Sequence, residues 1–318
     1  MAEKQTVVAI TGPTATGKTG LAIALAKEWN GEIISCDSMQ IYRGLEIGTA
    51  QPTAQERDQV PHHLIGFLDW EEKFSVSDYV SLAGKAIMEI CSQGKLPILV
   101  GGTGLYARSL LRGFTFKEEC RSEELREQLF HQAQELGPGE MHRRLTELDP
   151  ISAEIIHPNN TKRVLRALEY TILSGEPFSQ QAARSQKAEP VYRYVMLCPV
   201  FRDRQKLYER INLRVDEMLA AGLLEEAVAF FRFCQTARKL PTAAQSIGYK
   251  ELFPYFRGKI SLNEAVESIK QESRRYAKRQ LTWFAREPQI RYLYMDELHS
   301  IQAAKKMAVE ILREEGVL

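Results

Sequence analysis

A glycine-rich segment near the start of the chain has the residue spacing of a phosphate-binding loop. Its residues are Gly12, Pro13, Thr14, Ala15, Thr16, Gly17, Lys18 and Thr19. Glycines let backbone N–H groups turn toward an anion, the lysine adds a full positive charge, and the threonine hydroxyl can bind Mg²⁺. The segment follows a strand-like run, Thr6–Thr11, and opens a helical pattern, Thr19–Trp29, as this motif requires. It therefore predicts an anion site without identifying the anion.

A carboxylate, Asp37, follows the next apolar run, Glu32–Cys36. It is the only acidic residue that ends an early strand-like run, because Pro97–Val100 ends in two glycines and Thr103. The residues alone leave three interpretations open: a distant Mg²⁺ ligand, a general base, or a turn in which the side chain binds nearby backbone. The chain has no N-K-x-D motif of the kind by which GTPases select guanine.

Strand-like runs and helical patterns alternate in the first third of the chain. The helical patterns Thr19–Trp29, Val76–Gln93 and Leu105–Leu111 follow the three runs named above. This alternation predicts an α/β protein with a P-loop NTPase-like core, in which helices flank a parallel sheet. Ligands bind such sheets beyond the carboxyl ends of the strands, so the three loops should converge on one crevice. Tyr192–Cys198 and Ile290–Tyr294 are further candidate strands.

The region from about 115 to 189 differs in character from the rest of the chain. It has helical periodicity in Ser122–Leu136, Gly139–Leu148 and Thr161–Ser174, and no strand signal. We therefore expect an all-helical insertion domain at 115–189, which contacts tRNA if the resemblance described below holds, within a core domain formed by 1–114 and 190–318. The core should end in RNA-binding helices. The expected helices after Cys198 are Asp203–Ala220, Leu224–Cys234 and Leu262–Arg286.

Charge and composition restrict the partners and the compartment. The formal net charge is only +1, so a nucleic acid would have to be bound by a local basic patch. Such a patch lies in Ser268–Arg286, which carries six cationic residues and one glutamate; a solvated basic helix is the alternative. We expect Ile269, Tyr276 and Trp283 to pack inward. Five dispersed cysteines and the lack of an apolar run near 18 residues predict a cytoplasmic protein without membrane partners.

Eight further segments carry specific residue combinations in order along nearly the whole chain. They are Asp37–Arg43, Ile47–Ala50, Val60–Ile65, Gly101–Tyr106, His157–Asn160, Arg163–Glu169, Ile247–Glu251 and Tyr276–Phe284. Together they resemble the signature of the tRNA dimethylallyltransferases, also called tRNA isopentenyltransferases. Two positions depart from the family pattern, since Gly66 replaces an acidic residue and Ser246 replaces a more usual alanine. The chain lacks the zinc-finger tail of many eukaryotic members, so it resembles the bacterial type.

The resemblance implies a reaction and a set of catalytic residues. The loop would hold the diphosphate of dimethylallyl diphosphate, and the acceptor would be N6 of the adenine 3′ of the anticodon in tRNAs reading codons that begin with U. Asp37 would be the general base, and the Thr103 hydroxyl would meet the bridging oxygen. Lys18 and Arg214 would bind the diphosphate, with Mg²⁺ on Thr19. For Thr103 a helix N-cap or a turn at the strand end is the alternative. Arg210 is expected to lie with its stem along the apolar face of its helix and its guanidinium in solvent, although which of Arg210 and Arg214 binds the diphosphate stays open.

The resemblance and the basic residues also predict the tRNA contacts. An anticodon loop is single-stranded, so its adenine can be flipped into the crevice. The expected tRNA-binding residues are Asp37, Ser38, Met39, Gln40, Arg126, Lys162, Arg163, Val164, Leu165, Arg166, Gln245, Ser246, Ile247, Gly248, Tyr249, Lys250, Arg275 and Arg279. His62 and His63 are expected to be structural, and the protein is expected to be a monomer. Two other functions remain open: a P-loop kinase of a small molecule or nucleotide, and a non-catalytic RNA-binding protein.

Overall fold

The computed structural model describes residues 4–113, 122–187 and 189–317. The chain divides into two compact units, one formed by Met1–Leu111 with Val191–Leu318 and the other by Arg112–Pro190. The second division, at Pro190, lies one residue from the expected boundary. The expected first boundary, between 114 and 115, lies outside the described residues.

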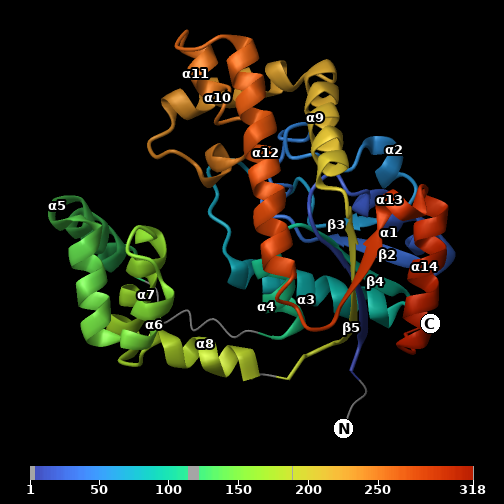
Figure 1. Ribbon diagram of the computed structural model, residues 1–318, viewed down its shortest axis with the longest axis horizontal. Helices are drawn as coiled ribbons and strands as arrows, with labels where there is room; N and C mark the ends of the chain where they lie inside the picture. The colour runs from blue at the N-terminus through green and yellow to red at the C-terminus, as the bar shows by residue number, and fades with distance from the viewer. Residues whose placement is uncertain (1–3, 114–121, 188, 318) are drawn as a thin grey trace. The chain divides into compact units, whose positions relative to one another are not determined.

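A six-stranded parallel sheet forms the centre of the first unit (Figure 1). The strand order is β3-β2-β4-β1-β5-β6. The strands are β1 (Thr6–Thr11), β2 (Gly31–Ser35), β3 (His62–His63), β4 (Leu96–Gly101), β5 (Arg193–Val200) and β6 (Ile290–Tyr294). Five of them confirm the expected runs to within two residues. The exception is β3, which pairs only two residues with β2 and is therefore too short to leave an alternating pattern.

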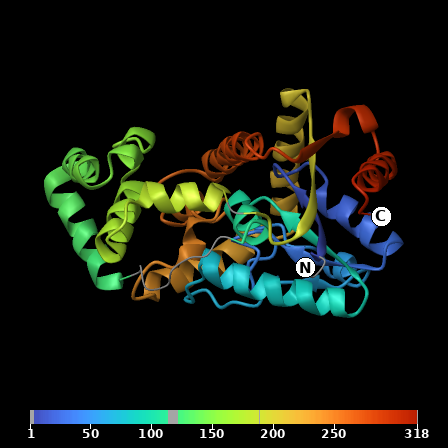
Figure 2. The same cartoon turned by 90° about the horizontal axis from the view of Figure 1, so that it is seen from below.

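Helices cover both faces of the sheet because alternate strand residues point to opposite sides. Val7 and Ala9 of β1 lie in one core cluster with α3 (Val76–Ser92) and α4 (Gly104–Leu111). Val8 and Ile10 lie in the other with α1 (Lys18–Glu28) and α14 (Ile301–Glu314). Figures 1 and 2 show α1 and α14 side by side on their face. Both faces are therefore buried, which explains the nearly continuous apolar character of the strands.

A third core cluster lies among the helices that follow β5. It joins α9 (Arg204–Ala220), α10 (Leu223–Thr236), α11 (Phe253–Phe256) and α12 (Leu262–Phe284) to the segment after β2. The remaining short elements of the unit are α2 (Ala54–Arg57), η2 (Thr242–Gln245) and α13 (Met295–Leu298). This cluster brings residues 41–47 against residues 243–253, although nearly 200 positions separate them in the sequence.

The second unit contains helices and no strand among its described residues. Its helices are α5 (Glu123–Leu148), α6 (Pro150–Ile155), α7 (Thr161–Ser174) and α8 (Phe178–Lys187). Within α5, Gly137 has a φ of 81° and Pro138 follows, so helical geometry breaks between the two expected helical patterns. Leu129, Met141, Val164 and Leu168 belong to its core cluster. None of the helices described in either unit is long and apolar enough to cross a membrane.

Candidate active site

A cavity of about 650 Å³ lies at the carboxyl ends of the central strands of the first unit. The loops after β1, β2 and β4 all contribute to its wall, which confirms that the three loops converge. Residues of α9, α12 and the segment 245–250 complete the lining. The cavity thus combines an anion-binding loop with a carboxylate and several apolar and polar side chains.

The phosphate loop has the backbone conformation that its glycines predicted. Gly12 and Gly17 have φ values of 140° and 87°, and a Cβ atom on Gly12 would lie 2.8 Å from the Cys198 Sγ. Residues Thr14 to Thr19 line the cavity. The Lys18 ammonium donates to the Pro13 carbonyl at 2.6 Å. Burial, together with the nearby Arg214, lowers the pKa of Lys18 to about 8, so its charge is sensitive to an arriving anion.

Two arginines of α9 contact the phosphate loop. Arg214 Nη1 donates to the Thr14 hydroxyl at 3.1 Å, and Arg210 Nε donates to the Ala15 carbonyl at 3.0 Å. Both side chains line the cavity. Arg210 is exposed, as expected of an arginine that keeps its guanidinium in solvent, and its Nε in addition binds the loop. Burial lowers the pKa of Arg214, while the Asp37 carboxylate acts against this change.

Asp37 lies two residues beyond the end of β2 and lines the cavity. Its Oδ1 accepts the Met39 backbone N–H at 2.9 Å, which is the turn that the sequence left open. Burial raises the pKa of Asp37 above its usual value, although the Met39 N–H and Lys18 act in the opposite direction. A carboxylate with a raised pKa binds a proton more strongly, so the same residue forms the turn and fits a general base.

Thr103 joins two of the converging loops. Its Oγ1 accepts the Ser38 backbone N–H at 3.0 Å, and its own N–H donates to the Cys36 carbonyl at 3.1 Å. Gly101 and Gly102 line the cavity, whereas Thr103 is not among its lining residues. The geometry therefore gives Thr103 a part in holding Ser38 beside Asp37. Its contact with a bridging oxygen stays a prediction.

Gln280 of α12 is a site residue that the sequence did not single out. It is buried, lines the cavity and bonds both loops: its Oε1 accepts the Thr14 N–H at 3.0 Å, and its Nε2 donates to the Gly102 carbonyl at 3.1 Å. A Cβ atom on Gly102 would lie 2.0 Å from Nε2, so the approach requires glycine. Gln280 thus fixes the first and third loops relative to each other. Only its position in a family-like motif could have pointed to it.

The expected nucleotide-binding segments form further walls of the cavity. Ser38, Met39, Gln40, Gln245, Ser246, Ile247, Gly248 and Lys250 all line it. The Gln40 amide is already bonded to Ser35 and to the carbonyls of Thr49 and Ala50, so its side chain holds the wall together. Tyr249 is fully buried and absent from the lining. The Tyr249 side chain packs in the third core cluster, and a tRNA contact of this residue stays a prediction.

The donor atoms in the wall fit a Mg²⁺ ion that accompanies a diphosphate. Thr19 offers a hydroxyl in the cavity, and Mg²⁺ prefers oxygen ligands, including substrate phosphates and water. Among the described residues, no group of three or more His, Cys, Asp or Glu side chains is placed to hold a metal. When an ion binds at Thr19, the diphosphate and water would supply its other ligands. His63 has a structural partner, because its Nε2 lies 2.6 Å from the Glu32 carboxylate.

The basic residues of α12 differ in their availability. Arg279 lines the cavity and stacks over Tyr276, while Arg275 is exposed and pairs with Glu272 at 2.6 Å. Lys270 pairs with Asp216 at 2.8 Å. The expectation that Trp283 packs inward was wrong, because its side chain is 36% exposed and lies under the Arg108 guanidinium. The inward face instead carries Ala265, Ile269, Ala277, Gln280 and Phe284.

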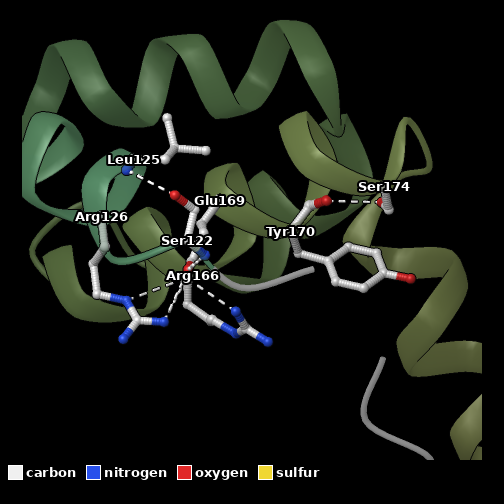
Figure 3. Close-up of polar contacts among 7 residues, drawn as sticks. All are labelled: Ser122, Leu125, Arg126, Arg166, Glu169, Tyr170 and Ser174. Atoms are coloured by element: carbon white, nitrogen blue, oxygen red, sulfur yellow. Dashed lines mark hydrogen bonds and ion pairs between the residues drawn. The ribbon is translucent and has the colours of Figure 1, made fainter. Parts of the chain in front are cut away.

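In the second unit, two of the expected tRNA-binding arginines surround a buried carboxylate (Figure 3). Glu169 is 1% exposed and lies 2.8 Å from Arg126 Nη2 and 2.9 Å from Arg166 Nη1. Burial alone would raise the pKa of Glu169, but hydrogen bonds from both arginines lower it overall. Both arginines therefore stabilise the fold of the unit, whether or not they also contact tRNA.

The other expected residues of α7 divide by burial. Lys162 and Arg163 are exposed and remain predicted tRNA contacts. Val164 and Leu165 lie in the core cluster, and Val164 has no exposed surface. The amphipathic helix directs these two side chains inward, and a tRNA contact of either residue stays a prediction.

The fold and the cavity define a class of protein: a P-loop enzyme whose anion loop faces a carboxylate across a cavity too large for diphosphate alone. Two family models match the chain, "IPP transferase" over residues 40–287 and "Isopentenyl transferase" over residues 5–63. The chain is 49% identical to a tRNA dimethylallyltransferase of Bacillus subtilis, over 95% of each chain. It is 48% identical to the enzyme of the same name from Geobacillus kaustophilus, over 93% of this chain and 92% of that one.

Solved structures agree with these relatives. The tRNA delta(2)-isopentenylpyrophosphate transferase of Staphylococcus epidermidis is 40% identical, with a TM-score of 0.70 over 98% of this chain and 99% of that one. A eukaryotic dimethylallyltransferase acting on tRNA is 28% identical, with a TM-score of 0.85 over 98% of this chain and 79% of that one. The chain belongs to the tRNA dimethylallyltransferase family. It is a prenyltransferase that modifies tRNA, which decides against both the kinase and the non-catalytic alternative.

Proposed function

We propose that the protein transfers the dimethylallyl group of dimethylallyl diphosphate to N6 of the adenine 3′ of the anticodon, in tRNAs that read codons beginning with U. The product would be N6-isopentenyladenosine. The observation that carries the proposal is the position of Asp37 and the phosphate loop in the wall of one cavity, so that a base and an anion site face the same space.

The donor half of the site supplies positive charge to a leaving diphosphate. Lys18, Arg210 and Arg214 approach the loop from two helices, and the loop adds the N–H groups of a helix N-terminus. When bound at Thr19, Mg²⁺ would neutralise part of the diphosphate charge. Such preorganised charge stabilises a transition state in which the C1–O bond breaks and the electron pair leaves with the diphosphate.

The acceptor half must remove a proton. The adenine N6 is a weak nucleophile because its lone pair is delocalised into the ring. As N6 bonds to C1 of the donor, it loses one proton, and the Asp37 carboxylate takes it. Burial in the cavity wall raises the basicity of Asp37 for this step.

The tRNA would bind with its anticodon loop at the cavity mouth and the adenine flipped inward. Arg279 lies in the cavity wall, and Arg275 and Lys278 continue the cationic surface along α12. Ser38, Met39 and the segment 245–250 are the walls against which the base would pack.

The substitution Asp37→Asn tests the base assignment. It preserves the side-chain size and the hydrogen bond to Met39, so both substrates should bind within a few-fold of the parent. The single-turnover rate with labelled dimethylallyl diphosphate and tRNA should fall by at least about 10²-fold. Asp58→Asn, an exposed position outside the cavity, is the matched control and should retain the parental rate.

A Mg²⁺ titration of the same variant distinguishes the two roles of Asp37. If Asp37 served the metal, excess Mg²⁺ would restore the rate, and that recovery would overturn the base assignment. Mass spectrometry of digested tRNA locates the modified nucleotide. Label at any position other than the adenine 3′ of the anticodon would refute the proposed acceptor.

A further inference from the structure

The carboxylate of Glu226, on the first turn of α10, accepts four hydrogen bonds from two distant segments. Its Oε2 accepts the backbone N–H groups of Glu46 at 2.7 Å and Ile47 at 2.9 Å. Its Oε1 accepts the Gly48 N–H at 2.9 Å and the Tyr249 hydroxyl at 2.6 Å. Glu226 is 178 to 180 positions from the first segment and 23 from the second.

The donors belong to the two segments that form the acceptor side of the cavity. Gly48, Thr49 and Ala50 line it from one segment, and residues 245–248 and Lys250 line it from the other. Glu226 itself is not among the lining residues. Glu226 therefore does not face the cavity, and its side chain is hydrogen-bonded to both segments that do.

The contact between the two segments is close and depends on this arrangement. A Cβ atom on Gly48 would lie 2.5 Å from the Tyr249 ring, so the segments meet at a position that only glycine allows. Three consecutive backbone N–H groups point toward the same place. All three are donors, so they cannot bond to one another, and one anion accepts from all of them. A glutamine amide at the same place has only one acceptor oxygen. Its NH₂ group would face at least one of these N–H donors and could not accept from it.

We propose that Glu226 is a positioning residue, which fixes the wall against which the acceptor adenine is held. This inference rests on the proposed function, because it takes these two segments to be the acceptor side. The phosphate loop is bonded by Lys18, Arg210, Arg214 and Gln280 and by no group of this network. Loss of the Glu226 carboxylate should therefore affect the tRNA and spare the donor.

The substitution Glu226→Gln tests the inference with a side chain of the same length. With an anticodon stem-loop as substrate and saturating dimethylallyl diphosphate, kcat/KM should fall about tenfold, because a misplaced N6 reacts slowly. The Kd of dimethylallyl diphosphate, measured by calorimetry without tRNA, should stay within about twofold of the parent. Glu225→Gln is the matched control: it removes the same charge from the adjacent, exposed residue and should leave both quantities unchanged.

A second variant keeps the test decisive if Glu226→Gln fails to fold. Tyr249→Phe removes one of the four donors and should lower kcat/KM for the stem-loop a few-fold, again without changing donor affinity. Equal losses for donor and acceptor would overturn the proposal. So would parental kinetics in a folded Glu226→Gln protein with a lowered melting temperature, since the residue would then be purely structural. The parent's own activity on the stem-loop tests the proposed function separately.

Discussion

The lowered pKa of Lys18 predicts a specific pH dependence for binding of dimethylallyl diphosphate. Below about pH 8 the Lys18 ammonium is charged in the free protein, and above it the group is neutral. A bound diphosphate attracts the ammonium and raises its pKa, so binding favours the protonated form. Affinity should therefore be constant at lower pH and fall as the pH rises through about 8.

The size of the fall follows from the fraction of protein that carries the proton. Half of the Lys18 side chains are charged at a pH equal to the pKa, and about a tenth are charged one unit higher. If only the charged form binds well, Kd should rise about twofold at pH 8 and about tenfold at pH 9, relative to pH 7. A phosphate ester loses its last proton at about pH 6, so the ligand should not contribute to this change.

Calorimetry with dimethylallyl diphosphate at fixed free Mg²⁺ and without tRNA would measure this profile from pH 7 to 9. Lys18→Met should bind weakly and show no fall, because it has no proton to lose. Lys27→Met is the matched control, since Lys27 lies on the same helix and bonds to Gln59 outside the cavity, and it should reproduce the parental profile. A parental Kd that is flat across this range, or a Lys18→Met profile with the parental slope, would refute the reasoning.

Two further predictions concern α12. Charge reversal by Arg275→Glu together with Arg279→Glu should raise KM for tRNA and flatten its salt dependence, because fewer counterions are released on binding. The affinity for the donor, measured without tRNA, should not change. If neither substitution alters tRNA binding, the basic face is only a solvated surface. Gln280→Leu removes the bonds that join the first and third loops and should weaken donor binding about tenfold, because two buried backbone groups lose their partner. Gln271→Leu, exposed on the same helix, is its control, and equal donor affinity in the two variants would contradict the bridging role.

The local sequence determined most strands of the sheet, several helices and the phosphate loop. Periodicity and glycine spacing act over a few residues, so Thr6–Thr11, Thr161–Ser174 and Ile290–Tyr294 were predicted with the bounds that the structure has. The short strand β3 escaped because its two residues acquire strand geometry only by pairing with β2. In the same way, helical spacing predicted that Ile269 is buried but misplaced Trp283, since the position of the buried stripe depends on what α12 packs against.

Only the tertiary structure decided which side chains serve the site and which serve the fold. Gln280 meets Thr14 across 266 positions, and Glu226 meets Gly48 across 178, so no spacing in the sequence marks either pair. Arg126 and Arg210 illustrate the same limit. Arg126 was expected at a nucleic acid and binds a buried glutamate, and Arg210 was expected to reach solvent and, although exposed, also binds the phosphate loop. A charged side chain is long and flexible, and its residue type is compatible with several partners. Which partner it binds depends on the groups that the folded chain brings within hydrogen-bonding distance.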